Sequence, residues 1–361
     1  MKELFALLDR IESLIDEKRE KEKLRKAEDI MNSRADFPPI RFLYPYEFTP
    51  YSIAEIHEEK WKMMFNELLP YYQSLLVDDD MLPMIRANYG VGTFVSQFGY
   101  QQKIVGNTMP WVSHGTLDEC VEAMKNRDEA LLDKVLETQE FYREILRRYE
   151  KCSKWIRLYH CDLQGPLDNL HLMLGNDLYY MMYDDEDTLK KLLEQISARY
   201  VETLKKVRSN IDDIYDDNTI YHWQSLYRGK AVLRNDTAVT ISKEMYEKFS
   251  LPYEEWISSQ IGGASFHYCG KEISYFDSML KIKGFGTLNI GAVPSMRYNT
   301  LFLSDALGKL RENSSSLNWI ELQKADVKQE IAELKKFGNF SVVVTVSNVN
   351  EAKKLKEEIA G

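Results

Sequence analysis

Short apolar runs alternate with longer amphipathic segments along most of this 361-residue chain. A short apolar run bounded by turn residues predicts a buried strand, and a longer segment with apolar residues three and four positions apart predicts a helix. Strands and helices that alternate in this way form parallel sheets, because each helix returns the chain to the edge where the previous strand began. The alternation therefore predicts an α/β protein.

Eight segments have the composition of strands. They are residues 83–89, 104–112, 155–163, 231–236, 264–269, 287–292, 318–322 and 340–346. The clearest helical patterns between and after them cover residues 187–211, 243–261, 325–337 and 351–360. Eight strands, each followed by a helix or a turn, fit a closed (β/α)8 TIM barrel better than an open sheet.

The start of the chain follows another pattern. Apolar residues recur at helical spacing over residues 4–15 and again over residues 53–76, with an aromatic-rich segment between the two. We therefore expect an N-terminal helical extension at residues 1–80 and a barrel domain at residues 81–361.

Charge and hydropathy exclude several kinds of partner. The net charge of −10 produces a field that repels phosphate backbones, so we do not expect a nucleic acid partner. No apolar run approaches the roughly 20 residues of a membrane span, and the charged residues 1–29 predict a helix rather than a signal peptide. The four cysteines are scattered, which is typical of reduced thiols in the cytoplasm. We expect a cytoplasmic protein with a small-molecule substrate and no membrane contact.

Polar residues gather where the predicted strands end, which is where a barrel carries its active site. The interior of a barrel otherwise favours branched apolar side chains, so these residues predict a polar mouth. The residues that we expect to bind substrate there are Asn88, Tyr89, Asp162, Gln164, Arg234 and Asn289.

The sequence His267-Tyr268-Cys269 is the sharpest chemical signal. Residues two positions apart on a strand share a face, so the imidazole and the thiol converge. Zn²⁺ accepts both ligand types in tetrahedral sites. The alternative is a histidine and a cysteine that are buried together by chance, because two ligands at this spacing are not specific.

Two carboxylates remain open to more than one interpretation. Asp162 either serves the pocket or bonds to its own backbone in the turn before Gly165. Asp236 is either a pocket carboxylate or a partner for Arg234. Ser242 has a simpler role, since it is predicted to cap a helix N-terminus.

Several segments, taken in order, resemble one family. They are RANYGVGTFVSQFGYQ (86–101) with PWV (110–112), DLQGPLDNLHLMLGNDLYYMMYDD (162–185), DTAVTISKEMYEKFSLPYEEWI (236–257) and FHYCG (266–270). Over residues 40–361 the chain is similar to the uroporphyrinogen decarboxylase superfamily, and the nearest branch is that of the cobalamin-dependent methyltransferases. The resemblance implies a TIM barrel, a homodimer, and a zinc site at His267 and Cys269.

Two departures from the family's patterns bear on function. True uroporphyrinogen decarboxylases have an arginine-rich first strand and a late histidine, but this chain has only Arg86 in that strand and no histidine after His267. The methyltransferases complete their zinc site with a late cysteine, where this chain has Ser347 near the expected place. The residues that could replace that ligand are Asp162, Asp236 and Asn289.

The resemblance thus implies a methyltransferase that moves a methyl group between a corrinoid on a partner protein and a small thiol or pterin. Its catalytic residues would be His267, Cys269 and Asp236, with zinc as the metal. The alternatives are a decarboxylase or other lyase that acts on a carboxylate-bearing substrate, and a non-catalytic module that binds a corrinoid or another tetrapyrrole.

Overall fold

A computed structural model describes residues 1–32, 34–270, 273–291 and 300–360 of the chain. Its main feature is a six-stranded parallel sheet in the order β1-β13-β12-β11-β10-β9. The strands of this sheet are β1 (Ile40–Leu43), β9 (Val232–Arg234), β10 (Ala264–Cys269), β11 (Phe285–Gly291), β12 (Leu317–Leu322) and β13 (Phe340–Thr345). The prediction of an α/β protein with parallel strands is confirmed.

Among the described residues, three smaller sheets accompany the main one. A parallel pair joins β2 (Met84–Ile85) to β5 (Arg157–Leu158), and an antiparallel pair joins β3 (Gln102–Lys103) to β4 (Trp111–Val112). An antiparallel sheet contains β6 (Ile214–Asp216), β7 (Thr219–His222) and β8 (Ser225–Arg228).

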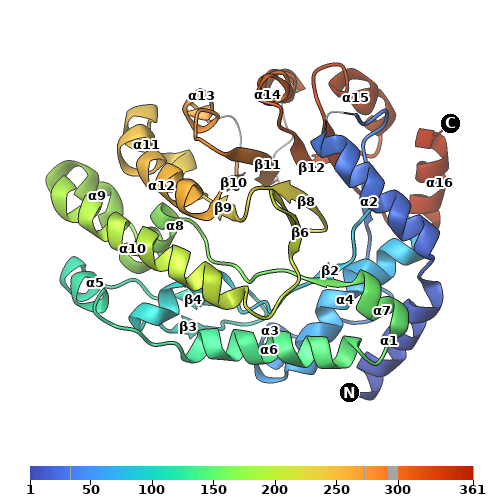
Figure 1. Cartoon of the computed structure of the whole chain (residues 1–361), viewed down its shortest axis with the longest axis horizontal. Coiled ribbons are helices and arrows are strands. Elements are labelled where there is room, and N and C mark those ends of the chain that lie inside the picture. Colours follow the sequence, from blue (N-terminus) through green and yellow to red (C-terminus); the bar gives the residue numbers. More distant parts are fainter. Residues whose placement is uncertain (33, 271–272, 292–299, 361) are drawn as a thin grey trace.

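The helices lie around the strands, as the outer ring of ribbons in Figure 1 shows. Those before β5 are α1 (Lys2–Leu14), α2 (Glu17–Met31), α3 (Ile53–Glu58), α4 (Lys60–Val77), α5 (Leu117–Ala123), α6 (Ala130–Leu146) and α7 (Glu150–Trp155). Those after β5 are α8 (Pro166–Leu174), α9 (Asp177–Asp184), α10 (Glu186–Val207), α11 (Lys243–Phe249), α12 (Leu251–Ile261), α13 (Phe276–Met279), α14 (Thr300–Glu312), α15 (Val327–Leu334) and α16 (Val349–Ala360). The 3-10 helices are η1 (Val91–Thr93), η2 (Val95–Phe98) and η3 (Thr237–Thr240). No helix of the described residues is both long and apolar enough to cross a bilayer.

The hydrophobic core forms where helices cover the sheet. On β10, Phe266 and Tyr268 are buried, and they alternate with His267, which faces the other side of the strand. Leu288 of β11 and Val342 of β13 are also fully buried. One face of the sheet is therefore apolar and fixes the strands, which leaves the opposite face available for polar side chains.

The structure corrects several strand predictions. Residues 104–112 do not form a parallel strand, because the only strand in the segment is β4 at its end, which pairs antiparallel with β3 just before the segment. The segment expected to be a helical extension contains β1, which pairs with β13 in the main sheet. The strands β2 and β5 are much shorter than predicted, and residue 292 of the predicted strand 287–292 lies outside the described residues.

The β7–β8 hairpin was not predicted at all. Its turn consists of Trp223 and Gln224, whose φ angles are positive, at 39° and 58° respectively. A two-residue turn with both residues in this region matches the twist of the flanking strands, but it is usually made by asparagine and glycine. The large side chains at these positions gave no sequence signal for a turn.

Candidate metal centre

Four neighbouring strands place a row of polar side chains on one face of the main sheet. In the ladder of β9, β10, β11 and β12, Arg234 is opposite His267, His267 is opposite Asn289, and Asn289 is opposite Asn318. Residues that pair in register across parallel strands point to the same face. The row therefore comes directly from the strand register, and all four residues are buried.

A second group lies toward the C-terminal ends of the same strands. Asp236, His267 and Cys269 can each supply a ligand atom, and these atoms all lie within 4.8 Å of one another. The His267 Nε2 atom is 3.3 Å from Cys269 Sγ and 3.6 Å from Asp236 Oδ1. The backbone N–H of Cys269 also donates to Asp236 Oδ1 at 2.5 Å. Among the described histidines, cysteines and acids, this is the group that meets the geometry of a metal site.

Hydrogen bonds determine which nitrogen of His267 is free to bind a metal. The amide of Asn289 donates from Nδ2 to the Asn318 carbonyl at 2.7 Å, so its Oδ1 faces His267 and can only accept. His267 Nδ1 lies 2.6 Å from that Oδ1 and must therefore carry the proton. The lone pair is then on Nε2, which faces Cys269 and Asp236. An outer hydrogen bond of this kind is typical of metal-binding histidines.

The space around these atoms also fits a metal ion. A Cβ atom at Gly291 would lie 2.5 Å from Cys269 Sγ and 2.9 Å from His267 Cε1, so only glycine leaves this side of the cluster open. Tetrahedral zinc with ordinary bond lengths holds its ligand atoms about 3.3–3.6 Å apart. The two separations from His267 Nε2, 3.3 Å to Cys269 Sγ and 3.6 Å to Asp236 Oδ1, fall within that spacing. The set of nitrogen, sulfur and oxygen donors also suits zinc.

The electrostatics of the cluster favour a cation. Burial, together with the negative charge of Asp236, raises the pKa of Cys269 to about 12 and that of Asp168 to about 7. Burial lowers the pKa of His267, so its ring stays neutral. The nearby Arg234 is already paired with Asp162. A divalent cation would supply the missing positive charge and would deprotonate the thiol.

The contacts of the two carboxylates bear on the interpretations that the sequence left open. Arg234 pairs with Asp162, not with Asp236, and both partners are at least nine-tenths buried. Asp162 also accepts from the backbone and side-chain N–H groups of Gln164 at 3.1 and 2.9 Å, so it shapes its own turn as well. Ser242 caps α11 as predicted.

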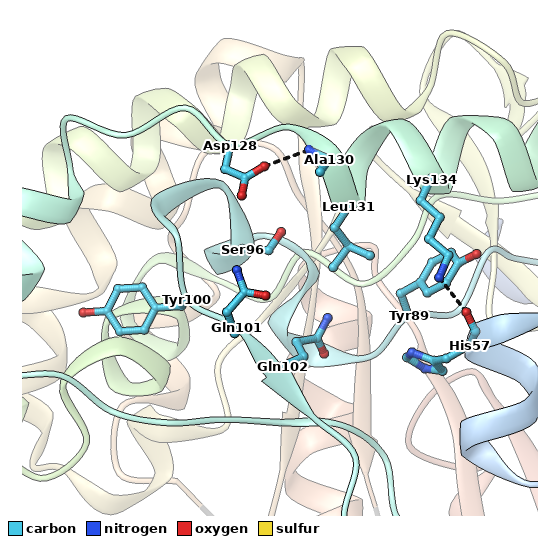
Figure 2. A pocket seen from close by; sticks show the side chains of 10 residues that line it. All are labelled: His57, Tyr89, Ser96, Tyr100, Gln101, Gln102, Asp128, Ala130, Leu131 and Lys134. Atoms are coloured by element: carbon cyan, nitrogen blue, oxygen red, sulfur yellow. Dashed lines mark hydrogen bonds between the residues drawn. The ribbon is translucent and has the colours of Figure 1, made fainter.

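Asn88 and Tyr89 have partners of their own. Asn88 donates to Glu67 at 3.1 Å, and the Tyr89 hydroxyl is 2.8 Å from that of Thr138. Tyr89 lines a cavity of about 320 Å³ between α3, β3 and the start of α6, where it lies beside His57 and Lys134 (Figure 2). The Lys134 ammonium donates to the His57 carbonyl at 2.5 Å.

Ser347, near the expected place of the missing cysteine, is exposed just after β13. Its backbone N–H donates to Glu351 at 2.6 Å at the start of α16. In the hydrogen-bonded order of the sheet, β11 and β12 separate β13 from β10. Of the three replacements considered for that cysteine, Asp236 is the one that lies in the cluster.

Sequence reasoning missed three residues around the cluster. Gly291 leaves the space described above, and Asp168 accepts hydrogen bonds from the backbone beside Asp236. The Trp223 ring lies against both Arg234, at 4.3 Å, and His267, with 4.8 Å between ring centroids. For Asp168 the sequence offered one signal, because it stands six residues after Asp162 in the same quoted segment.

Comparison of the chain with known protein families and with curated proteins found no match.

Proposed function

We propose that the strands close into an eight-stranded barrel in the order β1, β2, β5, β9, β10, β11, β12 and β13. Two neighbouring pairs in this order, β1 with β2 and β5 with β9, share no backbone strand pairing, and side chains connect them instead. Asp79 and Asp80, just before β2, accept from the N–H groups of Phe42 and Ile40 in β1, each at 3.0 Å. The ion pair between Asp162 and Arg234 joins the turn after β5 to β9.

The β7–β8 hairpin with its turn supports the same proposal, because residues from seven of these strands contact it. They are Arg41 of β1, Met84 of β2, Arg157 of β5, Arg234 of β9, His267 of β10, Thr287 of β11 and Asn318 of β12. A hairpin with contacts in so many directions is expected inside a ring of strands. The cluster of Asp236, His267 and Cys269 would then lie at the C-terminal mouth, where such barrels carry their active sites.

We propose that the protein is a zinc-dependent methyltransferase, with Asp236, His267 and Cys269 as the metal ligands. The observation that carries the proposal is the convergence of these three donors, with the tautomer of His267 set by Asn289. A zinc ion held there would keep an acceptor thiol in its thiolate form near neutral pH. The nature of the transferred group and of its carrier, a corrinoid on a partner protein, comes from the resemblance of the segments quoted above.

The residues of the chain would contribute binding and orientation. Asn289 holds the His267 ring in one orientation through its hydrogen bond to Nδ1. Beside the ring, Arg234 and Asp162 form a buried ion pair. In the proposed reaction the acceptor sulfur forms a bond to the methyl carbon. The bond between the methyl group and its carrier breaks with the electron pair left on the carrier, and the thiol proton passes to solvent.

Metal analysis and a transfer assay test the proposal together. The wild type should bind one zinc ion per chain and should methylate a thiol from methylcobalamin. Cys269→Ala should lose both properties. Cys120→Ala is the matched control, because Cys120 is a buried free cysteine outside the cluster.

The outcomes separate the alternatives. Zinc binding without transfer to any thiol or pterin would favour the non-catalytic module or a lyase over the methyltransferase. A wild type that binds no zinc when zinc is added, with Cys269→Ala unchanged in activity, would overturn the metal proposal itself.

A further inference from the structure

The backbone beside Asp236 is held by a buried carboxylate on another element. Asp168 lies in the first turn of α8 and is almost fully buried. Its Oδ2 accepts from the N–H of Asp236 at 2.9 Å, and its Oδ1 accepts from the N–H of Thr237 at 2.7 Å. Because each oxygen takes one N–H, the carboxylate fixes both the position and the orientation of this short backbone segment.

The start of α8 is itself fixed against β9. A Cβ atom at Gly165 would lie 2.1 Å from the carbonyl oxygen of Arg234, so glycine alone permits this close approach. Asn169 anchors the same turn, because its Nδ2 donates to the carbonyls of Leu163 and Gly165, each at 2.9 Å. The helix therefore presents Asp168 to residues 236 and 237 from a rigid base.

The hydrogen bonds continue from Asp168 through Asp236 to β10, the strand that carries His267 and Cys269. Asp236 Oδ1 accepts from the backbone N–H of Cys269 at 2.5 Å and lies 3.6 Å from His267 Nε2. The side chain of Asp236 is about half exposed, so packing alone does not immobilise it. Its placement depends on the backbone that Asp168 holds and on the bond from Cys269.

We propose that Asp168 is the positioning residue of the metal centre, which holds Asp236 at the point where its carboxylate meets His267 and Cys269. The inference rests on the proposed function, since it assigns Asp236 as a ligand. Asp168 touches neither substrate nor metal in this arrangement. Loss of an outer hydrogen bond to a ligand typically weakens metal affinity by about 10- to 100-fold.

The variant that tests this is Asp168→Asn, which keeps the shape of the side chain. An amide can accept only one of the two N–H groups and directs its own N–H groups at the other. The matched control is Asp79→Asn, because Asp79 is equally buried and its two oxygens also accept from backbone N–H groups, those of Phe42 and Met81, without contact to Asp236. Asp168→Ser, which keeps one acceptor, replaces the first variant if Asp168→Asn does not fold.

The first readout needs no metal. Selective ¹⁵N labelling of cysteine gives an amide signal for each of Cys120, Cys152, Cys161 and Cys269, and the Cys269 signal is assigned by its loss in Cys269→Ala. In metal-free protein, Asp168→Asn should move the Cys269 amide proton upfield and speed its exchange at least about tenfold, because the short bond to Asp236 is lost. The other three signals should stay in place, and Asp79→Asn should leave the Cys269 signal unchanged.

The second readout is zinc affinity, measured by competition with a chromophoric chelator. Asp168→Asn should weaken binding by about 10- to 100-fold, and Asp79→Asn by less than about threefold. If the Cys269 amide in Asp168→Asn matches the wild type, or shifts equally in Asp79→Asn, the positioning role is wrong. If the amide responds as expected but the wild type binds no zinc, the proposed metal function fails while the positioning of Asp236 stands.

Discussion

The substitution Gly291→Ala should close the space for a metal ion without straining the backbone. Gly291 is not among the glycines with a positive φ angle, so alanine imposes no backbone strain there. The added Cβ would lie 2.5 Å from Cys269 Sγ, whereas an ordinary contact between heavy atoms is about 3.5–4.0 Å. The sulfur atom must therefore move by at least about 1 Å.

Such a displacement is large on the scale of metal coordination, where bond lengths vary by about 0.2 Å. We expect zinc affinity to fall at least about 100-fold, which corresponds to about 2.8 kcal/mol. Overpacking should lower the free energy of unfolding by about 1–3 kcal/mol, partly offset because alanine restricts the unfolded chain. Chelator competition measures the first quantity, and thermal unfolding of metal-free protein measures the second.

Gly308→Ala is the matched control, because a Cβ there, on α14, meets no atom within 4 Å. Alanine in a helix interior should raise stability by about 0.5–1 kcal/mol and should leave zinc affinity unchanged. If Gly291→Ala binds zinc as tightly as the wild type, Gly291 does not border the metal position and the assignment of ligands is refuted.

Two further substitutions test the surroundings of the cluster. Asp162→Ala should lower the unfolding free energy, measured by urea titration, by about 3–5 kcal/mol, because it leaves Arg234 buried without its partner. In the same assay Glu47→Ala, which breaks an exposed ion pair with Arg10, should lower it by less than about 1 kcal/mol. Burial lowers the pKa of His160 to about 3, so its neutral ring contributes stability that is complete above about pH 6.5 and is lost as the pH falls toward 3. His160→Phe should reduce the slope of unfolding free energy against pH in that window by up to about 1.4 kcal/mol per pH unit, and an unchanged slope would show that His160 is protonated in the folded protein.

The sequence predicted the second half of the fold well because its strands are long and apolar. The strand at residues 264–269 has the predicted bounds, and those near residues 318–322 and 340–346 differ by one residue at an end. By contrast, β2 and β5 pair with each other over two residues only, so the apolar segments that predicted them are longer than the hydrogen-bonded strands. Periodicity reports burial, and a buried segment need not hydrogen-bond along its length.

The strand β1 was missed for a different reason. Its residues stand between a double proline and a tyrosine-rich segment, which resembles a loop. What makes Ile40–Leu43 a strand is its place between β13 and the carboxylates of Asp79 and Asp80, which accept its amide protons. The partners of these aspartates are distant in sequence, so no local pattern could reveal them.

The candidate site shows the same limit at the level of single residues. His267 and Cys269 could be paired from sequence because the strand period brings residues two apart to one face. The choice of Asp236 over Asp162 could not be made, since both are acids in a turn just beyond a strand. The choice depends on Arg234, which pairs in register with His267. The guanidinium of Arg234 contacts Asp162, and Asp236 faces the cluster instead. An ion pair across two segments thus decides which carboxylate faces His267 and Cys269, and three candidate metal ligands come together without a late cysteine.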